Sequence, residues 1–235
     1  MADESDLDAL VRRVDPDRWL ASRFVADPAA RTDLIALYAF NHELARAAEV
    51  ASQPLVGEMR LAWWREALDE MFEGRPVRRH PTAQAMTEAV RRRGLDQEAL
   101  TALVDAHLRD LDGWPLAAGE ALAYAQATAG RLMALAAAVL APRAALGSVE
   151  AAGQAWGVAG LSRVGRLPAE WSGDDVHRHI VHALGSANAH LRALPVAAFP
   201  AVAYATLARA YGARRDPSEL GKRWRLLAAV TTGKV

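Results

Sequence analysis

Residues 28–50 read PAARTDLIALYAFNHELARAAEV. Asp27 stands before this stretch as a helix cap, and Pro28 occupies the first helical position, where its missing N–H costs nothing. The apolar residues recur with helical spacing and do not alternate as they would in a half-buried strand. The stretch therefore predicts one long helix and an α-helical fold.

The chain on either side of this helix follows the same pattern. Asp15-Pro16 starts a helix upstream, and Gln53-Pro54 breaks the chain before a helix expected from about Val56 to Phe72. Trp64 shares one face of that helix with leucines three before and four after it, so we expect its indole in the core. Further helices are expected over residues 82–93, 96–112, 119–140, 149–166, 174–194 and 198–211, and from Asp216, with Glu219 closing a capping box. Because no segment alternates over strand length, we predict an all-α single domain over residues 1–235.

The composition limits the classes of function. Hydrophobic residues make up 52% of the 235 residues, which is enough for a packed core. Lys+Arg and Asp+Glu both number 28, so no net charge favours nucleic acid as a partner. The absence of Cys excludes disulfides and thiolate metal sites. The acidic start differs from a signal peptide, and the most apolar stretch, residues 132–140, is too short to span a bilayer. We therefore expect no transmembrane segment and a cytoplasmic protein, or one peripheral to the inner membrane.

Two local clusters of side chains can each be interpreted as a functional site or as part of the structure. His179 and His182 share a helix face, as a metal pair would, but a solvated amphipathic helix explains them better, with Asp174 and Asp175 as caps. Trp63 beside Trp64 fits packing better than nucleic-acid stacking, because no basic field surrounds them. The phosphate loop, the nucleophile elbow and the HExxH motif do not occur. These residues alone do not assign a chemistry.

Five motifs follow one another along the chain: Leu37–Asn41 ("LYAFN"), Gly57–Arg65 ("GEMRLAWWR"), His80-Pro81, the helix with Asp105 and Asp110, and Tyr124–Gly130. Together they resemble the squalene/phytoene synthase family. Their order and spacing follow the family over residues 15–168, and the C-terminal part is shortened or divergent. The resemblance implies a helical bundle of the isoprenoid (trans-prenyltransferase) synthase type.

The acidic residues that the family uses do not carry over. Family enzymes hold prenyl diphosphates through magnesium ions bound by two pairs of aspartates, each pair four residues apart on a helix. In this chain the first pair falls on Ala45 and Glu49, and the second falls on Val164 and Pro168. We therefore expect no catalytic residue, no metal site and no cofactor, with magnesium required only if the chain is an enzyme after all.

Leu37–Ala45 and Gly57–Arg65 resemble most closely the "LYAFNxELA" and "GEIRLxWWR" motifs of the branch that includes the mitochondrial complex I assembly factor and its bacterial relatives. This resemblance implies a non-catalytic accessory, assembly or lipid-binding factor, with a prenyl or other lipid ligand and a membrane-complex assembly partner. The alternatives are a divergent prenyltransferase acting on prenyl diphosphates and a helical module unrelated to isoprenoids. An apolar cavity is expected among segments 31–50, 100–111 and 121–140. The residues that the resemblance suggests for a pocket are Tyr38, Asn41, Ala45, Glu49, Asp105, Asp110, Gly130 and Arg163.

Overall fold

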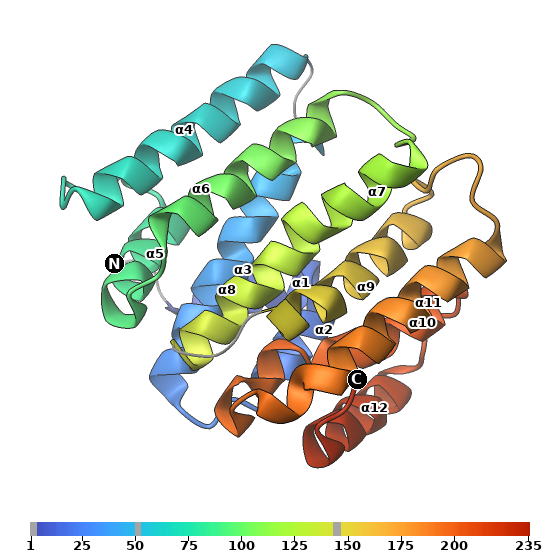
Figure 1. The fold of residues 1–235 in the computed structure, drawn as a ribbon. Helices are drawn as coiled ribbons and strands as arrows, with labels where there is room; N and C mark the ends of the chain where they lie inside the picture. The colour runs from blue at the N-terminus through green and yellow to red at the C-terminus, as the bar shows by residue number, and fades with distance from the viewer. Residues whose placement is uncertain (1–3, 50–52, 143–146) are drawn as a thin grey trace. The chain divides into compact units, whose positions relative to one another are not determined.

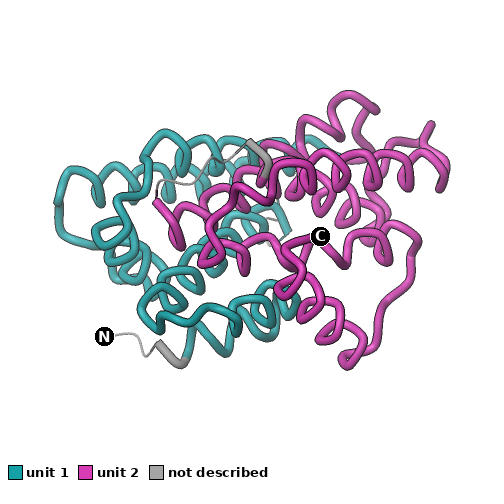
Figure 2. Tube along the Cα trace, turned by 60° about the horizontal axis from the view of Figure 1, so that its bottom comes forward, with its two compact units in different colours: residues 1–113 teal, residues 114–235 magenta. Residues whose placement is uncertain are grey.

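A computed structural model describes residues 4–49, 53–142 and 147–235. Within these ranges the secondary structure is helical and includes no β-strand, which confirms the all-α class (Figure 1). The chain forms two compact units, unit 1 (Met1–Gly113) and unit 2 (Trp114–Val235), coloured separately in Figure 2. The single domain over residues 1–235 stays a prediction.

Unit 1 is built around the helix that the opening sequence predicts. Its helices are α1 (Glu4–Val14), α2 (Pro16–Ser22), α3 (Pro28–Glu49), α4 (Pro54–Phe72), α5 (Pro81–Arg93), α6 (Gln97–Ala106) and the 3-10 helix η1 (His107–Leu111). Helix α3 packs against α1, α2, α4, α5 and η1, and its apolar side chains from Leu34 to Leu44 form the core of the unit. Val50, the expected last residue of α3, lies outside the described residues.

The helix starts in unit 1 follow the local signals. Asp15 accepts a hydrogen bond from the Arg18 amide at 3.3 Å, and Asp27 accepts one from the Ala29 amide at 2.9 Å. The second bond lowers the pKa of Asp27, because the amide stabilises the charged carboxylate. Helix α1 was not expected from the sequence, and the predicted helix over residues 96–112 changes to 3-10 geometry at His107.

Unit 2 is built around α9 (Gly147–Arg163), which packs against most of its neighbours. The other elements are α7 (Ala118–Ala125), the π-helical segment η2 (Gln126–Gly130), α8 (Arg131–Leu140), α10 (Gly173–His190), η3 (Leu191–Ala193), η4 (Val196–Ala201), η5 (Ala203–Leu207), α11 (Ala208–Gly212) and α12 (Glu219–Thr232). The predicted continuous helix over residues 198–211 is wrong, because this stretch consists of the 3-10 segments η4 and η5 followed by the short α11. Pro200 lies inside η4, and a proline there cannot donate the backbone bond that an α-helix needs.

Glycines let two elements of unit 2 approach closely. A Cβ atom built on Gly153 of α9 would lie 2.5 Å from the Cα of Gly130 in η2. A Cβ atom on Gly157, one turn later, would lie 2.7 Å from the Cβ of Ala125. Real Cβ atoms do not come this close to other atoms, so only glycine fits at these positions.

Candidate functional site

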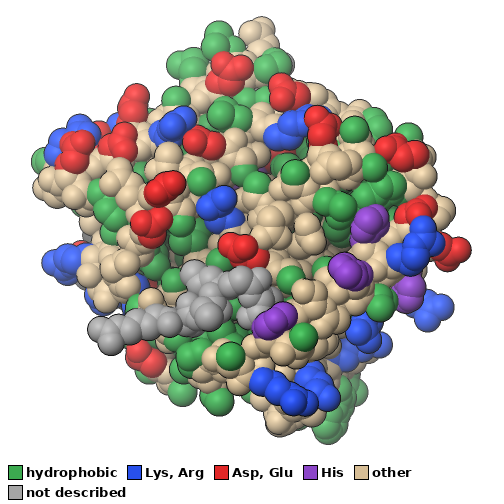
Figure 3. Space-filling model, in the orientation of Figure 1, with side chains coloured by type: hydrophobic (Ala, Val, Ile, Leu, Met, Phe, Trp, Pro, Cys, Tyr) green, Lys and Arg blue, Asp and Glu red, His purple; other side chains and the backbone are tan. Residues whose placement is uncertain are grey.

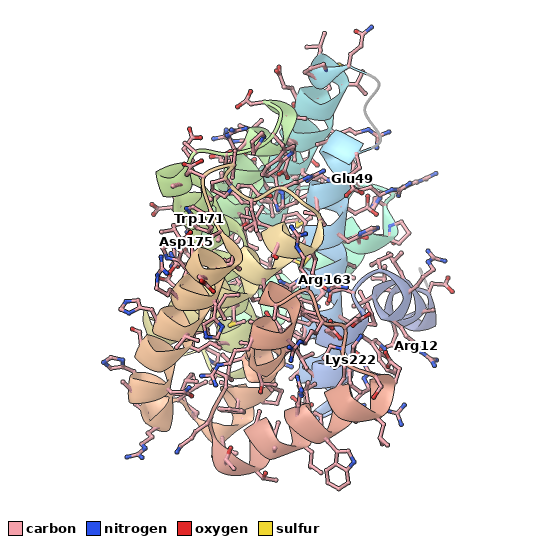
Figure 4. The ribbon with its side chains drawn as sticks, turned by 90° about the vertical axis from the view of Figure 1, so that its right-hand side faces the viewer. Arg12, Glu49, Arg163, Trp171, Asp175 and Lys222 are labelled. Carbon is pink, nitrogen blue, oxygen red and sulfur yellow. The ribbon has the colours of Figure 1, made fainter. Side chains whose placement is uncertain are left out.

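The first group of expected pocket residues lies on one face of α3. Tyr38, Asn41, Ala45 and Glu49 are three, four and four residues apart, so they follow one line along the helix. Tyr38 is buried, Asn41 and Ala45 are half-buried, and Glu49 is the exposed last residue of α3 (Figure 4). At the two positions of the expected first acidic pair, this face therefore presents one carboxylate and one methyl group.

Asp105 and Asp110 are engaged by partners that the sequence reasoning missed. Arg65 on α4 forms an ion pair with Asp105 on α6, with 2.9 Å between its Nη1 and Asp105 Oδ1. The ring Nδ1 of His107 lies 2.7 Å from Asp110 Oδ2, and both side chains are 5% exposed. The 107–110 spacing is visible in the sequence as an i, i+3 pair, whereas the Arg65–Asp105 pair depends on how α4 packs against α6.

A groove of about 450 Å³ lies beside α4 in unit 1. Its lining residues are Glu43, Val56, Met59, Arg60, Trp63, Trp64 and His80. The imidazole of His80 meets both indoles edge to face, at 5.6 Å from Trp63 and 5.2 Å from Trp64. Trp64 is 4% exposed and also meets Phe40 at 5.2 Å, which confirms its core position, and half-buried Trp63 lies at the edge of the groove.

Arg78 and two glutamates of α4 hold the loop before α5 against this groove. Arg78 lies 4.8 Å from the centre of the Trp63 ring and donates to Glu70 at 2.7 Å and to Glu66 at 2.8 Å. The hydrogen bonds from Arg78 lower the pKa of Glu70, and the two carboxylates raise the pKa of Arg78. Because the charges of Arg78, Glu66 and Glu70 are paired with one another, we assign these three side chains a structural role.

The second expected acidic pair falls beyond the end of a helix. The Arg166 amide donates to the Leu161 carbonyl at 2.9 Å, and the Gly165 amide donates to the Ser162 carbonyl at 3.4 Å. Gly165 has a φ of 68°, so these bonds form a Schellman motif that ends α9 at Arg163. Val164 and Pro168 therefore lie outside the helix and share no helical face. The predicted extension of this helix to residue 166 is wrong for the same reason.

The surface at this helix end is cationic. A pocket of about 330 Å³ is lined by Ser162, Arg163, Gly165, Tyr211, Arg214, Arg215 and Asp216. Arg163 lies 4.2 Å from the centre of the Tyr211 ring, and Lys222 approaches the same ring at 5.8 Å (Arg163 and Lys222 are labelled in Figure 4). Three arginines and one aspartate give this pocket a positive balance, which suits an anion better than a metal cation.

Gly130 serves packing in the described geometry. It closes η2 and faces Gly153 at the close approach described above. Its neighbour Thr128 donates to the Tyr124 carbonyl at 2.7 Å, within the same turn. The atoms nearest to a Cβ built on Gly130 itself belong to the Gln126 side chain, at 3.1–3.3 Å, so the backbone contact with α9 restricts Gly153 and not Gly130.

Helix α10 carries four histidines, of which His177, His182 and His190 are exposed and His179 is half-buried. Figure 3 shows histidine side chains at the surface on the right-hand side of the view. His179 stacks on Trp171 at 4.4 Å, and Asp175 closes a capping box with Ser172. Hydrogen bonds from Ser172 lower the pKa of Asp175, as expected of a capping carboxylate (Figure 4). Among the described residues, no group of three His, Asp or Glu side chains is arranged to hold a metal ion.

The pocket residues expected from the sequence thus divide between the units. Tyr38, Asn41, Ala45, Glu49, Asp105 and Asp110 belong to unit 1, and Gly130 and Arg163 belong to unit 2. Their assignment to one pocket stays a prediction, as does the apolar cavity, because the contributing segments come from both units. No described helix has the length and apolar character to cross a membrane.

Comparisons with solved structures identify the fold. The chain is similar to a dehydrosqualene synthase, with a TM-score of 0.81 and 13% identity over 98% of this chain and 95% of that one. It is also similar to the squalene synthase HpnC from Alicyclobacillus acidocaldarius, with a TM-score of 0.61 and 20% identity over 98% and 94% of the two chains. At these identities the likeness establishes the fold alone, and it confirms the isoprenoid synthase type.

Comparisons of sequence give relatives and a family. The chain is 33% identical to NADH dehydrogenase (ubiquinone) complex I, assembly factor 6, of Bos taurus over 104 residues, 44% of this chain and 30% of that protein. The human protein of the same name is 32% identical over 104 residues, again 30% of its length. The matched region is therefore less than a third of these relatives. The family model for squalene/phytoene synthase matches residues 11–165. The chain belongs to the squalene/phytoene synthase family.

Proposed function

We propose that this chain is a non-catalytic member of its family that acts as an accessory, assembly or lipid-binding factor. The observation that carries the proposal is the end of α9 at Arg163. Two carboxylates four residues apart act together only when a helix places them on one face. Val164 and Pro168, where the second pair belongs, lie beyond the end of the helix and carry no charge.

The donor set on α3 adds further support. Magnesium prefers several oxygen ligands in octahedral geometry, and it bridges diphosphate through carboxylates that are held in place. Ala45 offers no oxygen, so Glu49 is the one carboxylate at the four expected positions. The residues present do not fit a magnesium–diphosphate cluster, and we derive no catalytic step through one.

The similarity to complex I assembly factor 6 supports an assembly role. It rests on 33% identity across 44% of this chain, so the partner complex is part of the proposal. The alternative, a divergent prenyltransferase, is favoured by the synthase fold over 98% of the chain and by the arginine-lined pocket beside α9. The prenyltransferase would need a metal ion to bind its diphosphate substrate, and the accessory factor would not.

A turnover assay separates these functions. The purified chain, with magnesium or manganese and labelled farnesyl or geranylgeranyl diphosphate, is expected to form no squalene, phytoene or cyclopropyl intermediate above a control without protein. Loss of one preorganised electrostatic group commonly costs a hundredfold or more in rate, and three of the four acidic positions are changed here. An active synthase of the family, run in parallel, shows that the substrates and metals are competent. Product formation would overturn the proposal, and Asp105 and Asp110 would then be the first residues to mutate.

Binding measurements test the proposed role as a lipid-binding or assembly factor. Titration calorimetry with farnesyl diphosphate, with magnesium and then with a chelator, should give the same affinity or no binding in both conditions. Magnesium-dependent binding would favour the enzyme. Copurification of NADH dehydrogenase subunits from a membrane extract of the native host, absent with an unrelated helical bait, is the result expected of an assembly factor.

A further inference from the structure

Helix α12 presents an apolar face to solvent in addition to the one that it buries. Leu226 and Ala229 are buried on the side that packs against η5. Leu220, Trp224 and Leu227 are 66%, 64% and 41% exposed. These three positions are four and three residues apart, so they form one stripe on the side of the helix opposite Leu226.

Unpaired cations accompany this stripe. Arg223 and Arg225 are exposed on α12, and neither forms an ion pair with any residue in the described part of the chain. The two nearby carboxylates face Lys222 instead, with Asp216 at 3.4 Å and Glu219 at 3.3 Å from its Nζ. Ser218, and not Asp216, caps the helix, so Glu219 does not close the capping box that the sequence suggested.

The charge of this segment contrasts with that of the whole chain. Residues 209–235 contain seven Lys and Arg and two Asp and Glu, whereas the chain has 28 of each class. Hydrophobic side chains reach the surface over α12 at the lower end of the view in Figure 3. An exposed Trp and two Leu next to a cationic flank combine the two attractions that hold a helix in the plane of a lipid surface.

We propose that the outer face of α12 docks on a bilayer containing anionic lipids. The helix would lie along the surface, with Leu220, Trp224 and Leu227 among the acyl chains near the headgroups. Indole rings favour this interfacial depth, and Arg223, about 70° around the helix from the middle of the stripe, would meet lipid phosphates. The inference does not depend on the proposed function, because it rests on the exposed side chains of α12 alone.

A second copy of the chain fits this face less well. The three side chains expose roughly 340 Å² together, taking about 200 Å² for a fully exposed large apolar side chain. A stable protein interface buries about 800 Å² on each partner. Two copies meeting through this stripe would also bring Arg223 of one copy toward the cationic helix of the other, and like charges oppose such a contact. The proposal therefore commits to a lipid surface.

Vesicle flotation tests the proposal directly. The probes are vesicles of phosphatidylcholine alone and vesicles of equal parts phosphatidylcholine and phosphatidylglycerol, without prenyl substrate. We expect the chain to float with the anionic vesicles and to be released as salt rises, because salt screens the arginine contribution. Trp224→Ser combined with Leu227→Ser should lower the partition coefficient roughly tenfold or more. Arg223→Gln should lower it about fivefold at low salt.

Matched controls separate docking from general surface effects. Val196 is 85% exposed on η4, so Val196→Ser removes an exposed apolar group elsewhere in unit 2 and should leave flotation unchanged. Arg192 on η3 is exposed, and Arg192→Gln controls for loss of positive charge. Circular dichroism melts of every variant should match the wild type, because all the altered side chains are at the surface. Equal flotation of the α12 variants and wild type, or no flotation with anionic vesicles, would overturn the proposal. So would self-association in sedimentation velocity that the same α12 variants abolish, since a second copy would then occupy the face.

Discussion

Replacing Gly153 with alanine tests the close approach of α9 to η2. The new Cβ would lie 2.5 Å from Gly130 Cα, 2.7 Å from the Ala129 carbonyl oxygen and 3.0 Å from the Ala129 carbonyl carbon. Carbon atoms in contact lie about 3.5–4 Å apart, so the two elements would have to separate by about 1 Å. All three obstructing atoms belong to backbone, which cannot turn aside as a flexible side chain would.

The expected loss follows from two opposing effects. Overpacking a tight core costs about 1–3 kcal/mol, and the backbone contacts place Gly153 at the upper end of that range. Alanine regains about 1 kcal/mol of helix propensity over glycine. We therefore expect Gly153→Ala to lower the free energy of unfolding by about 2 kcal/mol.

Gly160 on the same helix is the matched control. A Cβ built there meets no atom within 4 Å, so Gly160→Ala should raise the free energy of unfolding by about 0.5–1 kcal/mol. Urea unfolding followed by far-ultraviolet circular dichroism measures both variants, and hydrogen exchange should report faster exchange of η2 amides in Gly153→Ala alone. If the two variants are equally stable, the close approach of α9 to η2 is refuted.

Three further predictions concern side chains of unit 1 and their counterpart on α12. Trp64→Ala should cost about 4 kcal/mol of stability, as expected for truncation of an indole that is 4% exposed, whereas Trp224→Ala at 64% exposure should change stability by less than about 0.5 kcal/mol in the same urea titration. Asp33 has a side chain that is 0% exposed and lies 2.6 Å from each of two arginines on α5, so Asp33→Ala should cost about 3 kcal/mol, and a loss under about 1 kcal/mol would show that the pairs contribute little. The pKa of Glu70 is lowered in the folded state by Arg78, so the stability that this pair contributes is complete above the ordinary glutamate pKa and is lost as pH falls through the lowered value. Glu70→Gln should therefore reduce the dependence of urea stability on pH across the acid range, and an unchanged pH profile would contradict this linkage.

Several features of the fold could be read from short stretches of sequence. The starts of α2 and α3 follow from Pro16 and Pro28, because each proline lies in the first helical turn of its own segment. Helix α4 begins at Pro54, two residues before the start expected near Val56. The core position of Trp64 followed from its spacing to Leu61 and Leu68. Signals of this kind act within one or two turns, so no tertiary information is needed to find them.

Other predictions from the sequence were wrong where two local patterns compete. The stretch 198–211 has helical spacing, yet Pro200 and its buried neighbours adopt 3-10 geometry in η4 and η5. Gly165 ended α9 three residues earlier than the periodicity suggested, and glycine at a left-handed position was the signal that could have given this boundary.

The sequence by itself determined the all-α class, most helix starts and the family, because capping, periodicity and motif spacing are encoded within short segments. The candidate site was decided by tertiary structure. The pairing of Arg65 with Asp105, the gathering of Arg163 with Arg214 and Arg215, and the contact of Gly130 with Gly153 join residues that are far apart in the chain. The physical reason is that a side chain's partner depends on which helix packs against its own, and burial of apolar faces fixes that choice only when the whole unit folds.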